Sequence, residues 1–185
     1  MAKSKHTIRI ISGSLRGRRL PVLDLDGLRP TGDRLRETLF NWLQFEVVGK
    51  KVLDLCAGTG ALGFEALSRG AKFVVMVEAN NLAAQQLQQI SKDLSIDNMQ
   101  VNNQTGQSYL QSTDSQFDII FLDPPFKNNL MQELTDISVE RVVVGGYLYR
   151  EYAIDQELNI LADNWHLYRQ KTAGQVKIEL WQRMS

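Results

Sequence analysis

The chain has 185 residues, of which 43% are hydrophobic and 23% charged, and its 21 basic and 21 acidic side chains give a formal net charge of zero. This length suits one domain with one core, and no apolar run reaches the ~18 residues that a membrane span needs. The chain has one cysteine, Cys56, which excludes an internal disulfide framework and is typical of a reducing compartment. We therefore expect a cytoplasmic monomer with a single domain over residues 1–185.

The first 36 residues are strongly basic. They contain nine Lys and Arg against three Asp, a net charge of +6, so the rest of the chain carries −6. Polar and apolar residues alternate over residues 7–10, Arg16-Gly17-Arg18 suits a turn, and residues 20–22 are apolar again. This pattern predicts a basic β-hairpin within residues 1–32, ahead of a catalytic α/β core over 33–185. A flexible, solvated arm is the alternative.

A cationic surface at one end of a neutral chain is suited to contacts with phosphate groups. We therefore predict that nucleic acid contacts the side chains of Arg9, Arg16, Arg18, Arg19, Arg29 and Arg34.

An amphipathic helix is predicted over residues 33–45, because apolar side chains recur there at helical spacing. A strand over 52–56 then runs into a turn with Gly58, Gly60 and Gly63 in G-x-G-x-x-G spacing, and a helix follows to about Arg69. This spacing is typical of sites for nucleotide-like ligands and does not select one of them. Asp54, at the strand end, favours S-adenosylmethionine over NAD, because a carboxylate attracts a cationic amino group and is repelled by a pyrophosphate.

A second apolar strand, over residues 73–77, ends at Glu78. The two oxygens of a carboxylate can accept hydrogen bonds from both hydroxyls of a ribose. NAD would use this glutamate equally well, so Glu78 predicts a nucleoside and leaves its kind open. A helix over 81–93 and a short strand over 99–103 are expected next.

The strand predicted over residues 118–122 leads into Asp123-Pro124-Pro125-Phe126. This motif suits methylation of a planar, poorly basic NH2 group, whose protons must be held while its nitrogen attacks a methyl donor. Asp123 can accept one of those hydrogens and the Pro124 carbonyl another, because prolines lack an N–H and make the turn rigid. Phe126 can stack on a base. A turn that merely ends the strand is the alternative for this motif taken alone.

A helix over 128–139 and strands near 146–151, 165–170 and 175–182 complete the pattern. Strands alternating with helices predict an α/β fold with a mainly parallel, doubly wound sheet, helices on both faces, and ligands at the carboxyl ends of the strands. Asp54, Gly58, Glu78 and Asp123 all lie at or just beyond such ends, so we expect them to share one crevice.

The glycine-rich and Asp-Pro-Pro-Phe motifs together resemble the class I S-adenosylmethionine-dependent methyltransferases that methylate amino groups. Three further segments resemble the RsmD family, which methylates the N2 of one guanine in small-subunit ribosomal RNA: residues 9–13 (RIISG), 16–18 (RGR) and 28–43 (LRPTGDRLRETLFNWL). The resemblance covers nearly the whole chain, as far as Ala173-Gly174-Gln175-Val176. It implies a Rossmann-like methyltransferase sheet whose last strand is antiparallel.

The resemblance also implies roles for individual residues. Asp54 and the Gly58–Gly60 backbone hold the methionine part of the methyl donor, and Glu78 binds the ribose. Cys56, in the same loop, is counted among the cofactor-binding residues as a small packing residue and not as a catalytic one. The position that contacts adenine falls at about Thr105, where the family usually has Asp or Asn, and Asn103 is the nearby substitute. The implied partner is ribosomal RNA in the small subunit or an assembly intermediate, with the target guanine unstacked and no metal required.

Three alternatives remain open. Adenine-N6 DNA methyltransferases and glutamine methyltransferases of release factors share the Asp-Pro-Pro-Phe pattern, but they need a recognition domain for which this chain has little room. An NAD-linked oxidoreductase retains the glycine-rich loop and leaves Asp-Pro-Pro-Phe without a purpose. A non-catalytic RNA-binding protein uses only the basic segment.

Overall fold

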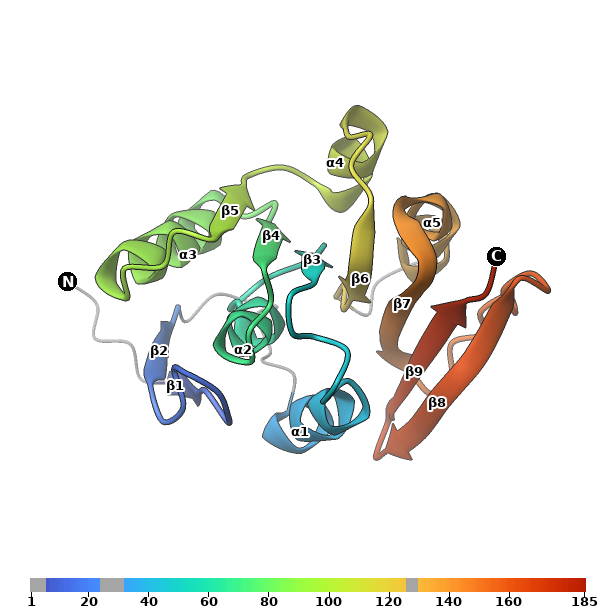
Figure 1. The fold of residues 1–185 in the computed structure, drawn as a ribbon, viewed down its shortest axis with the longest axis horizontal. Helices are drawn as coiled ribbons and strands as arrows, with labels where there is room; N and C mark the ends of the chain where they lie inside the picture. The colour runs from blue at the N-terminus through green and yellow to red at the C-terminus, as the bar shows by residue number, and fades with distance from the viewer. Residues whose placement is uncertain (1–5, 24–31, 126–129) are drawn as a thin grey trace.

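The structure, a computed structural model, describes residues 6–23, 32–125 and 130–185. After an N-terminal hairpin, helices and strands alternate along most of the chain, which ends in three consecutive strands (Figure 1). The elements are β1 (His6–Arg9), β2 (Arg19–Val22), α1 (Asp33–Trp42), β3 (Lys51–Asp54), α2 (Ala61–Ser68), β4 (Phe73–Val77), α3 (Asn81–Asp93), β5 (Met99–Asn102), α4 (Gly106–Ser112), β6 (Phe117–Leu122), α5 (Leu130–Ser138), the short 3-10 helix η1 (Val139–Arg141), β7 (Val142–Ala153), β8 (Trp165–Ala173) and β9 (Val176–Arg183).

The central sheet has seven strands in the order β5-β4-β3-β6-β7-β9-β8. The five strands from β5 to β7 pair in parallel, and β9 is antiparallel to both of its neighbours. The predicted fold class is therefore confirmed, including the antiparallel last strand. Because all parallel strands point the same way, their carboxyl ends meet at one edge, which we call the carboxyl edge.

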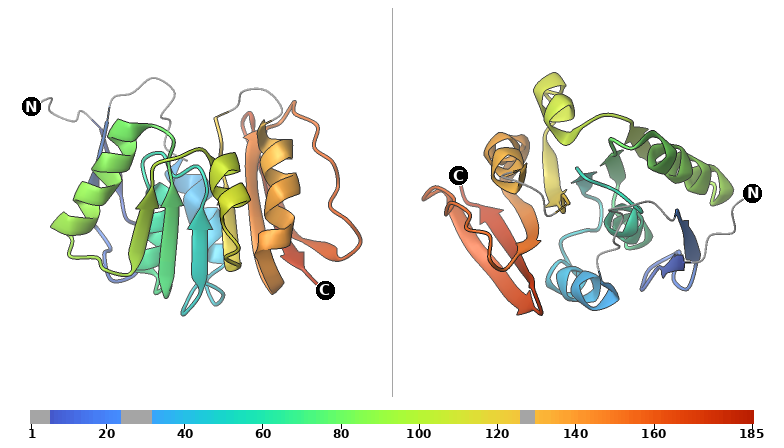
Figure 2. Two further views of the ribbon diagram at one scale, coloured as in Figure 1. Left: turned by 90° about the horizontal axis from the view of Figure 1, so that it is seen from above. Right: turned by 180° about the vertical axis from the view of Figure 1, so that it is seen from behind.

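Helices cover both faces of this sheet (Figure 2). On one face, here named the α2 face, α1, α2, α3 and the hairpin bury a core that includes Val52, Met76, Phe121 and Tyr149. On the opposite α5 face, α4 and α5 pack on Leu53, Val75, Leu122 and Leu148. Alternate residues of each strand thus enter different cores, which is why the parallel strands read as unbroken apolar runs.

Two elements differ most from the sequence-based expectations. The short helix α4 was not predicted, because its seven residues are mostly Gln, Ser and Gly and carry no helical apolar stripe. Strand β7 begins at Val142, four residues before the expected 146, and Gly145 within it has φ of 80°. The pairing with β6 shifts register at this point, between Phe117 and Ile119. A glycine in such a bulge resembles a turn in the sequence, although the strand continues.

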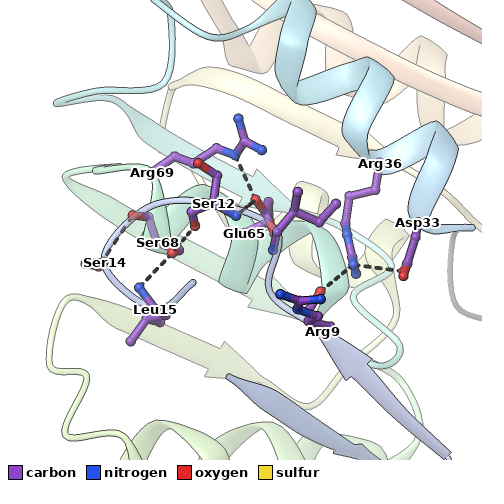
Figure 3. A network of polar contacts seen from close by, with 10 residues as sticks. Arg9, Ser12, Ser14, Leu15, Asp33, Arg36, Glu65, Ser68 and Arg69 are labelled. Atoms are coloured by element: carbon purple, nitrogen blue, oxygen red, sulfur yellow. Dashed lines mark hydrogen bonds and ion pairs between the residues drawn. The ribbon is translucent and has the colours of Figure 1, made fainter. Parts of the chain in front are cut away.

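The predicted hairpin is confirmed, with β1 and β2 antiparallel, and it is fixed to α2 rather than free in solvent (Figure 3). Glu65 of α2 is fully buried, and its carboxylate accepts the backbone N–H groups of Ile11 (2.8 Å) and Ser12 (3.0 Å) and Nε of Arg69 (2.7 Å). The Ser68 hydroxyl donates to the Ser12 carbonyl and accepts the N–H of Leu15. These contacts contradict the alternative of a flexible arm for the described residues 6–23.

Arg36 of α1 also bonds to the hairpin, and its burial corrects the count of surface cations expected in residues 1–36. Its side chain is fully buried, where Nη2 donates to the Arg9 carbonyl (2.6 Å) and to Asp33 (2.9 Å). One of the nine cations counted in residues 1–36 therefore contributes to packing and not to a cationic surface. None of the helices in the described residues is long and apolar enough to cross a membrane.

Hairpin docking gives a test with a matched pair of glycines. Gly13 and Gly17 both have φ of 83°, but a Cβ on Gly13 would lie 1.8 Å from the Ser68 carbonyl oxygen, whereas nothing lies within 4 Å of one on Gly17. Alanine at positive φ costs about 1 kcal/mol in either place. We expect Gly17→Ala to lower the free energy of unfolding by about that amount and Gly13→Ala by about 2 kcal/mol or more, measured by urea denaturation.

Undocking of the hairpin in Gly13→Ala should also expose Arg16 and Arg18 to faster cleavage by trypsin than in Gly17→Ala. Equal losses of stability and equal cleavage rates in the two variants would contradict a hairpin held against α2.

Candidate functional site

Four carboxylates lie at the carboxyl edge, one on each of four adjacent strands. From β4 to β7 across the sheet they are Glu78, Asp54, Asp123 and Glu151. All four continue the alternation of strand residues that face the α2-face core, such as Met76, Val52, Phe121 and Tyr149. The negative charges of Asp123 and Glu78 each raise the pKa of Asp54, which places the groups within electrostatic reach of one another. The crevice expected for Asp54, Glu78 and Asp123 is therefore where the structure brings them together.

Asp54 ends β3 and is almost completely buried. Burial raises the pKa of this carboxyl to about 7; the Gly63 N–H, which donates to Oδ2 at 2.9 Å, opposes the rise, and the charges of Asp123 and Glu78 add to it. An acid held near neutrality in this way is characteristic of functional sites. A cation placed beside it would favour the ionised form.

The glycine-rich loop and the start of α2 pack closely against Asp54 and the neighbouring strands. A Cβ on Gly63 would lie 2.4 Å from Cε of Met76 and 3.2 Å from Oδ2 of Asp54, and one on Gly60, at φ of 78°, would lie 2.6 Å from Leu87. A side chain at Gly63 would push α2 away from β3 and β4, and one at Gly60 would clash with Leu87 of α3. The spacing of the glycines therefore reflects close packing of α2 against the sheet, as well as room for a ligand.

Glu78 lies just past β4, and its carboxylate is hydrogen-bonded to the glycine-rich loop. Its Oε2 accepts the N–H of Gly58 at 2.7 Å, and its Oε1 accepts the N–H of Asn80 at 2.7 Å. Each oxygen retains capacity for a further hydrogen bond, because a carboxylate oxygen can accept two. Both oxygens are thus held in a fixed plane with room for a pair of donors, such as two ribose hydroxyls.

The two candidates for the adenine contact differ in their surroundings. Asn103 donates through Nδ2 to the carbonyls of Glu78 (2.8 Å) and Ala79 (3.1 Å), so it is tied to the Glu78 turn. Thr105 is the N-cap of α4, where its hydroxyl accepts the N–H of Ser108 at 3.2 Å and donates to the Ser108 hydroxyl at 2.9 Å. These bonds to the Glu78 and Ala79 carbonyls place Asn103, rather than Thr105, directly against the Glu78 end of the row.

The Asp-Pro-Pro-Phe motif of residues 123–126 follows β6 directly in the sequence. Asp123 is half-buried, Pro124 is buried and Pro125 is exposed, whereas Phe126 lies outside the described residues. Leu55 of the glycine loop donates its N–H to the Phe121 carbonyl at 3.1 Å, which joins the start of that loop to the strand end carrying Asp123. The glycine-rich loop and the turn that carries Asp123 are therefore adjacent in space.

Cys56 is partly exposed at the start of the same loop, and burial of the thiol together with the charges of Asp54, Asp123 and Glu78 raises its pKa strongly. A thiol so far from ionisation is a packing group and a poor nucleophile.

Sequence patterns missed one member of the row, Glu151. It is buried near the end of β7, and its Oε2 accepts a 2.7 Å hydrogen bond from the hydroxyl of the fully buried Tyr149. Burial, and then the charge of Asp123, raise the pKa of Glu151. The stretch Arg150-Glu151-Tyr152 reads as the charged end of a strand, and only the pairing of β7 with β6 shows that its carboxylate lies beside Asp123.

The predicted nucleic-acid contacts divide into two groups. The side chains of Arg9, Arg16, Arg18, Arg19 and Arg34 are exposed, and Arg29 lies outside the described residues. Arg34 belongs to the first turn of α1, whereas Arg16 and Arg18 belong to the loop that docks on Ser68, the last residue of α2. Helix α2 starts at the glycine-rich loop and rises about 1.5 Å per residue. The loop arginines, which lie beside its last residue, are therefore roughly 10 Å further from the carboxyl edge than the glycine-rich loop is.

Two of the hollows in the described surface bear on the position of the site. One, beside the glycine-rich loop, is lined by Val22, Gly58, Thr59, Ala83 and Gln86. The larger one lies at the amino ends of β6 and β7 and is lined by residues that include Glu46, Lys50, Asp118 and Gly145. Ligands of open parallel sheets bind at the carboxyl ends of the strands, so the larger hollow is not the site despite its size.

Comparison with known proteins agrees with this geometry over almost the full length. The family model described as conserved hypothetical protein 95 matches residues 8–182. Ribosomal RNA small subunit methyltransferase D from Escherichia coli (strain K12) is 41% identical over 189 residues, with 99% of this chain and 96% of that protein covered. The protein of the same name from Haemophilus influenzae is 43% identical over 185 residues, with 97% and 95% covered. A solved Escherichia coli structure described as the methyltransferase yhhF has a TM-score of 0.89 and 41% identity, with 97% and 99% covered.

The raised pKa of Asp54 predicts a pH-dependent cost to stability. Because the folded-state pKa of about 7 exceeds the ordinary value of 3.8, the unfolded chain loses this proton first, and stability falls as pH rises between the two values. Asp54→Asn retains an oxygen to accept the Gly63 N–H and removes the titration. We expect the stability of the variant relative to the parent protein to increase by about 2 to 3 kcal/mol between pH 5 and pH 8, measured by urea denaturation.

Proposed function

Because the chain belongs to the RsmD family of methyltransferases, we propose that it transfers the methyl group of S-adenosylmethionine to the exocyclic N2 of a guanine in small-subunit ribosomal RNA. The whole chain acts as one methyltransferase domain, with residues 1–32 as a basic extension of the catalytic core. The observation that carries this proposal is the shared carboxyl edge, where Glu78 and Asp54 adjoin Asp123 on neighbouring strands. A ribosomal substrate also implies that the protein works in the cytoplasm.

The residues present fit S-adenosylmethionine. Glu78 presents two fixed carboxylate oxygens to the ribose hydroxyls, and the buried Asp54 lies one strand away for the amino group of the methionine part. The glycine-rich loop between them is held close to β3 and β4, so its backbone can approach a ligand. The side-chain oxygen of Asn103 can accept the adenine amine, because its Nδ2 is already engaged.

S-adenosylmethionine supplies an electrophilic methyl group, and the protein supplies alignment. Asp123 and the Pro124 carbonyl accept the two hydrogens of the guanine N2 amine, which orients the nitrogen lone pair toward the methyl group. Phe126 stacks on the base. Holding two reactants in line can lower a barrier by as much as ~7 to 11 kcal/mol. The nitrogen can lose its extra proton after transfer, so no strong base is needed for the attack.

The arginines provide the electrostatic part of substrate binding. The exposed Arg9, Arg16, Arg18 and Arg19 lie on a hairpin that Glu65 and Ser68 hold rigidly against the cofactor-loop helix. Phosphate contacts of this kind position an RNA and carry no base identity. Selection of the target base must therefore come from the crevice itself.

The direct test is transfer of a labelled methyl group to small ribosomal subunits from cells that lack this protein, followed by nucleoside analysis of the RNA. We expect the label in N2-methylguanosine. Label in N6-methyladenosine, or transfer to DNA or to protein glutamine in place of RNA, would contradict the proposed acceptor and favour the related amino-methyltransferases.

The role of Asp123 predicts a separation of binding from transfer. Asp123→Ala should bind S-adenosylmethionine with nearly unchanged affinity, because Glu78 and Asp54 remain, and should transfer methyl at least about 100-fold more slowly, because the amine is no longer aligned. Calorimetry and single-turnover transfer measure the two quantities. Asp114→Ala, which removes a fully exposed aspartate, is the control that should change neither. Transfer by Asp123→Ala at the parent rate would rule out its role as the amine acceptor.

A further inference from the structure

Glu151 is placed as a partner of Asp123. Phe121 of β6 pairs with Tyr149 of β7, so Asp123 and Glu151 each lie two residues further along adjacent strands, on the same face of the sheet. Adjacent strands are about 4.8 Å apart. One edge of a planar base can therefore reach both carboxylates.

The orientation of Glu151 is fixed by an aromatic stack. Tyr149, whose hydroxyl donates to Oε2, packs its ring edge-on against Phe121 at a centroid distance of 6.1 Å, and Phe121 packs against Phe40 of α1 at 5.8 Å. The tyrosine ring is thus positioned by Phe121, which Phe40 supports in turn, and its hydroxyl is bonded to Glu151. It presents the carboxylate of Glu151 with its second oxygen, Oε1, available for another donor.

Structural stability does not account for this group. Only 5% of Glu151 is exposed, and in the described part of the chain the Tyr149 hydroxyl is the one donor bonded to it. A buried carboxylate without a cation is unfavourable, and an apolar side chain would pack there at less cost. Retaining an acid beside a second acid, Asp123, adds repulsion and indicates that a ligand supplies the missing donor.

The charges around Glu151 confirm that no described cation neutralises it. From β9, its register partner is the apolar Ile178. The nearby cations on surrounding elements are all engaged elsewhere: Lys171 of β8 with Thr38, Arg36 of α1 with Asp33 and the Arg9 carbonyl, and Arg150 and Lys177 with Glu179. The groups whose charge or hydrogen bond acts on Glu151 are Asp123 and Tyr149.

The bases that carry an exocyclic amine differ at the ring position next to it. In guanine that neighbour is N1–H, a donor, whereas adenine has N1 and cytosine has N3 there, both acceptors. An ionised carboxylate beside the amine site can bond to guanine and repels the other two. Such readout of the Watson–Crick edge requires an unstacked base, as methylation does.

We propose that Glu151, positioned by Tyr149, accepts the N1–H of the target guanine while Asp123 and Pro124 hold its N2 amine, so that two carboxylates on adjacent strands select guanine over adenine and cytosine. This inference rests on the proposed function and deepens it. Glu151 is then a residue that contacts the substrate, and Tyr149 is a positioning residue that acts through it.

The inference predicts an effect on pH dependence as well as on rate. Glu151 must release its proton to accept N1–H, and its pKa is raised by burial and by Asp123, so kcat/KM should increase with pH as this group ionises. Tyr149→Phe removes the hydrogen bond that favours the ionised form and should shift that increase to higher pH. Glu151→Gln should lower kcat/KM by about 10- to 100-fold and abolish this ionisation from the profile. All three proteins are compared on small subunits that lack the modification.

Inhibition of the parent protein by nucleosides tests the same contact without depending on a variant. Guanosine should inhibit transfer more strongly than 1-methylguanosine, in which a methyl group replaces the N1 hydrogen, and Glu151→Gln should narrow this difference. The control Glu140→Gln changes an exposed glutamate on η1 and should leave the profile and the inhibition unchanged.

The outcomes separate the two proposals. N2-methylguanosine formed by the parent protein, with equal kcat/KM and pH profile in Glu151→Gln, would overturn the role of Glu151 and leave the proposed function intact. Equal inhibition by guanosine and 1-methylguanosine would overturn it even if the variant failed to fold. Absence of N2-methylguanosine with the parent protein, despite binding of S-adenosylmethionine, would overturn both.

Discussion

The buried carboxylate of Glu65 is the contact on which the arrangement of this molecule depends. It lies on the side of α2 turned away from the sheet, and it is satisfied by two backbone N–H groups of the hairpin and by Arg69. All eight residues of α2 are buried, which is possible only because the hairpin covers the helix. Without the hairpin, the Glu65 carboxylate would keep only Arg69 and the Ser68 hydroxyl would lose its hairpin partners, at a cost of about 1 to 3 kcal/mol each. The hairpin, within the described residues 6–23, is therefore part of the fold and is fixed to the helix that follows the glycine-rich loop.

A second constraint acts at the carboxyl edge, where four acids on adjacent strands repel one another. Asp54 and Glu151 are both buried and their pKa values are both raised toward the neutral form, so the gathering of these acids is electrostatically unfavourable by itself. Its proposed ligands supply what is missing: a cationic amino group and ribose hydroxyls at the Glu78 and Asp54 end, and the N–H groups of guanine at the Asp123 and Glu151 end. Binding both ligands would relieve the repulsion, which is a common reason for functional sites to be less stable than their surroundings.

Elements with local signals were predictable from the sequence. Strand β4 and helix α3 have the predicted bounds, because an apolar run ends at Glu78 and because Asn80 caps α3 with hydrogen bonds to Leu82 and Ala83. Where tertiary contacts decide, the sequence was insufficient. Nothing local distinguishes the buried Arg36 from the exposed Arg34, and the pairing of Asp123 with Glu151 depends on a register between strands separated by a helix. Three of the four acids in the row belong to recognisable sequence patterns. The place of the fourth, Glu151, follows only from the pairing of strands in the sheet.

The placement of the arginines bears on what kind of RNA suits this surface. Arg34 lies in the first turn of α1, whereas Arg16 and Arg18 lie beside the last residue of α2, a helix roughly 12 Å long. A short single strand of RNA that enters the crevice would meet Arg34 but not Arg16 or Arg18. Because the Glu65 and Ser68 contacts hold the hairpin against α2, an RNA that binds the loop arginines as proposed has to extend to them. Phosphates spread over that distance, with one base unstacked between them, favour a folded RNA surface over a free nucleotide or a short strand.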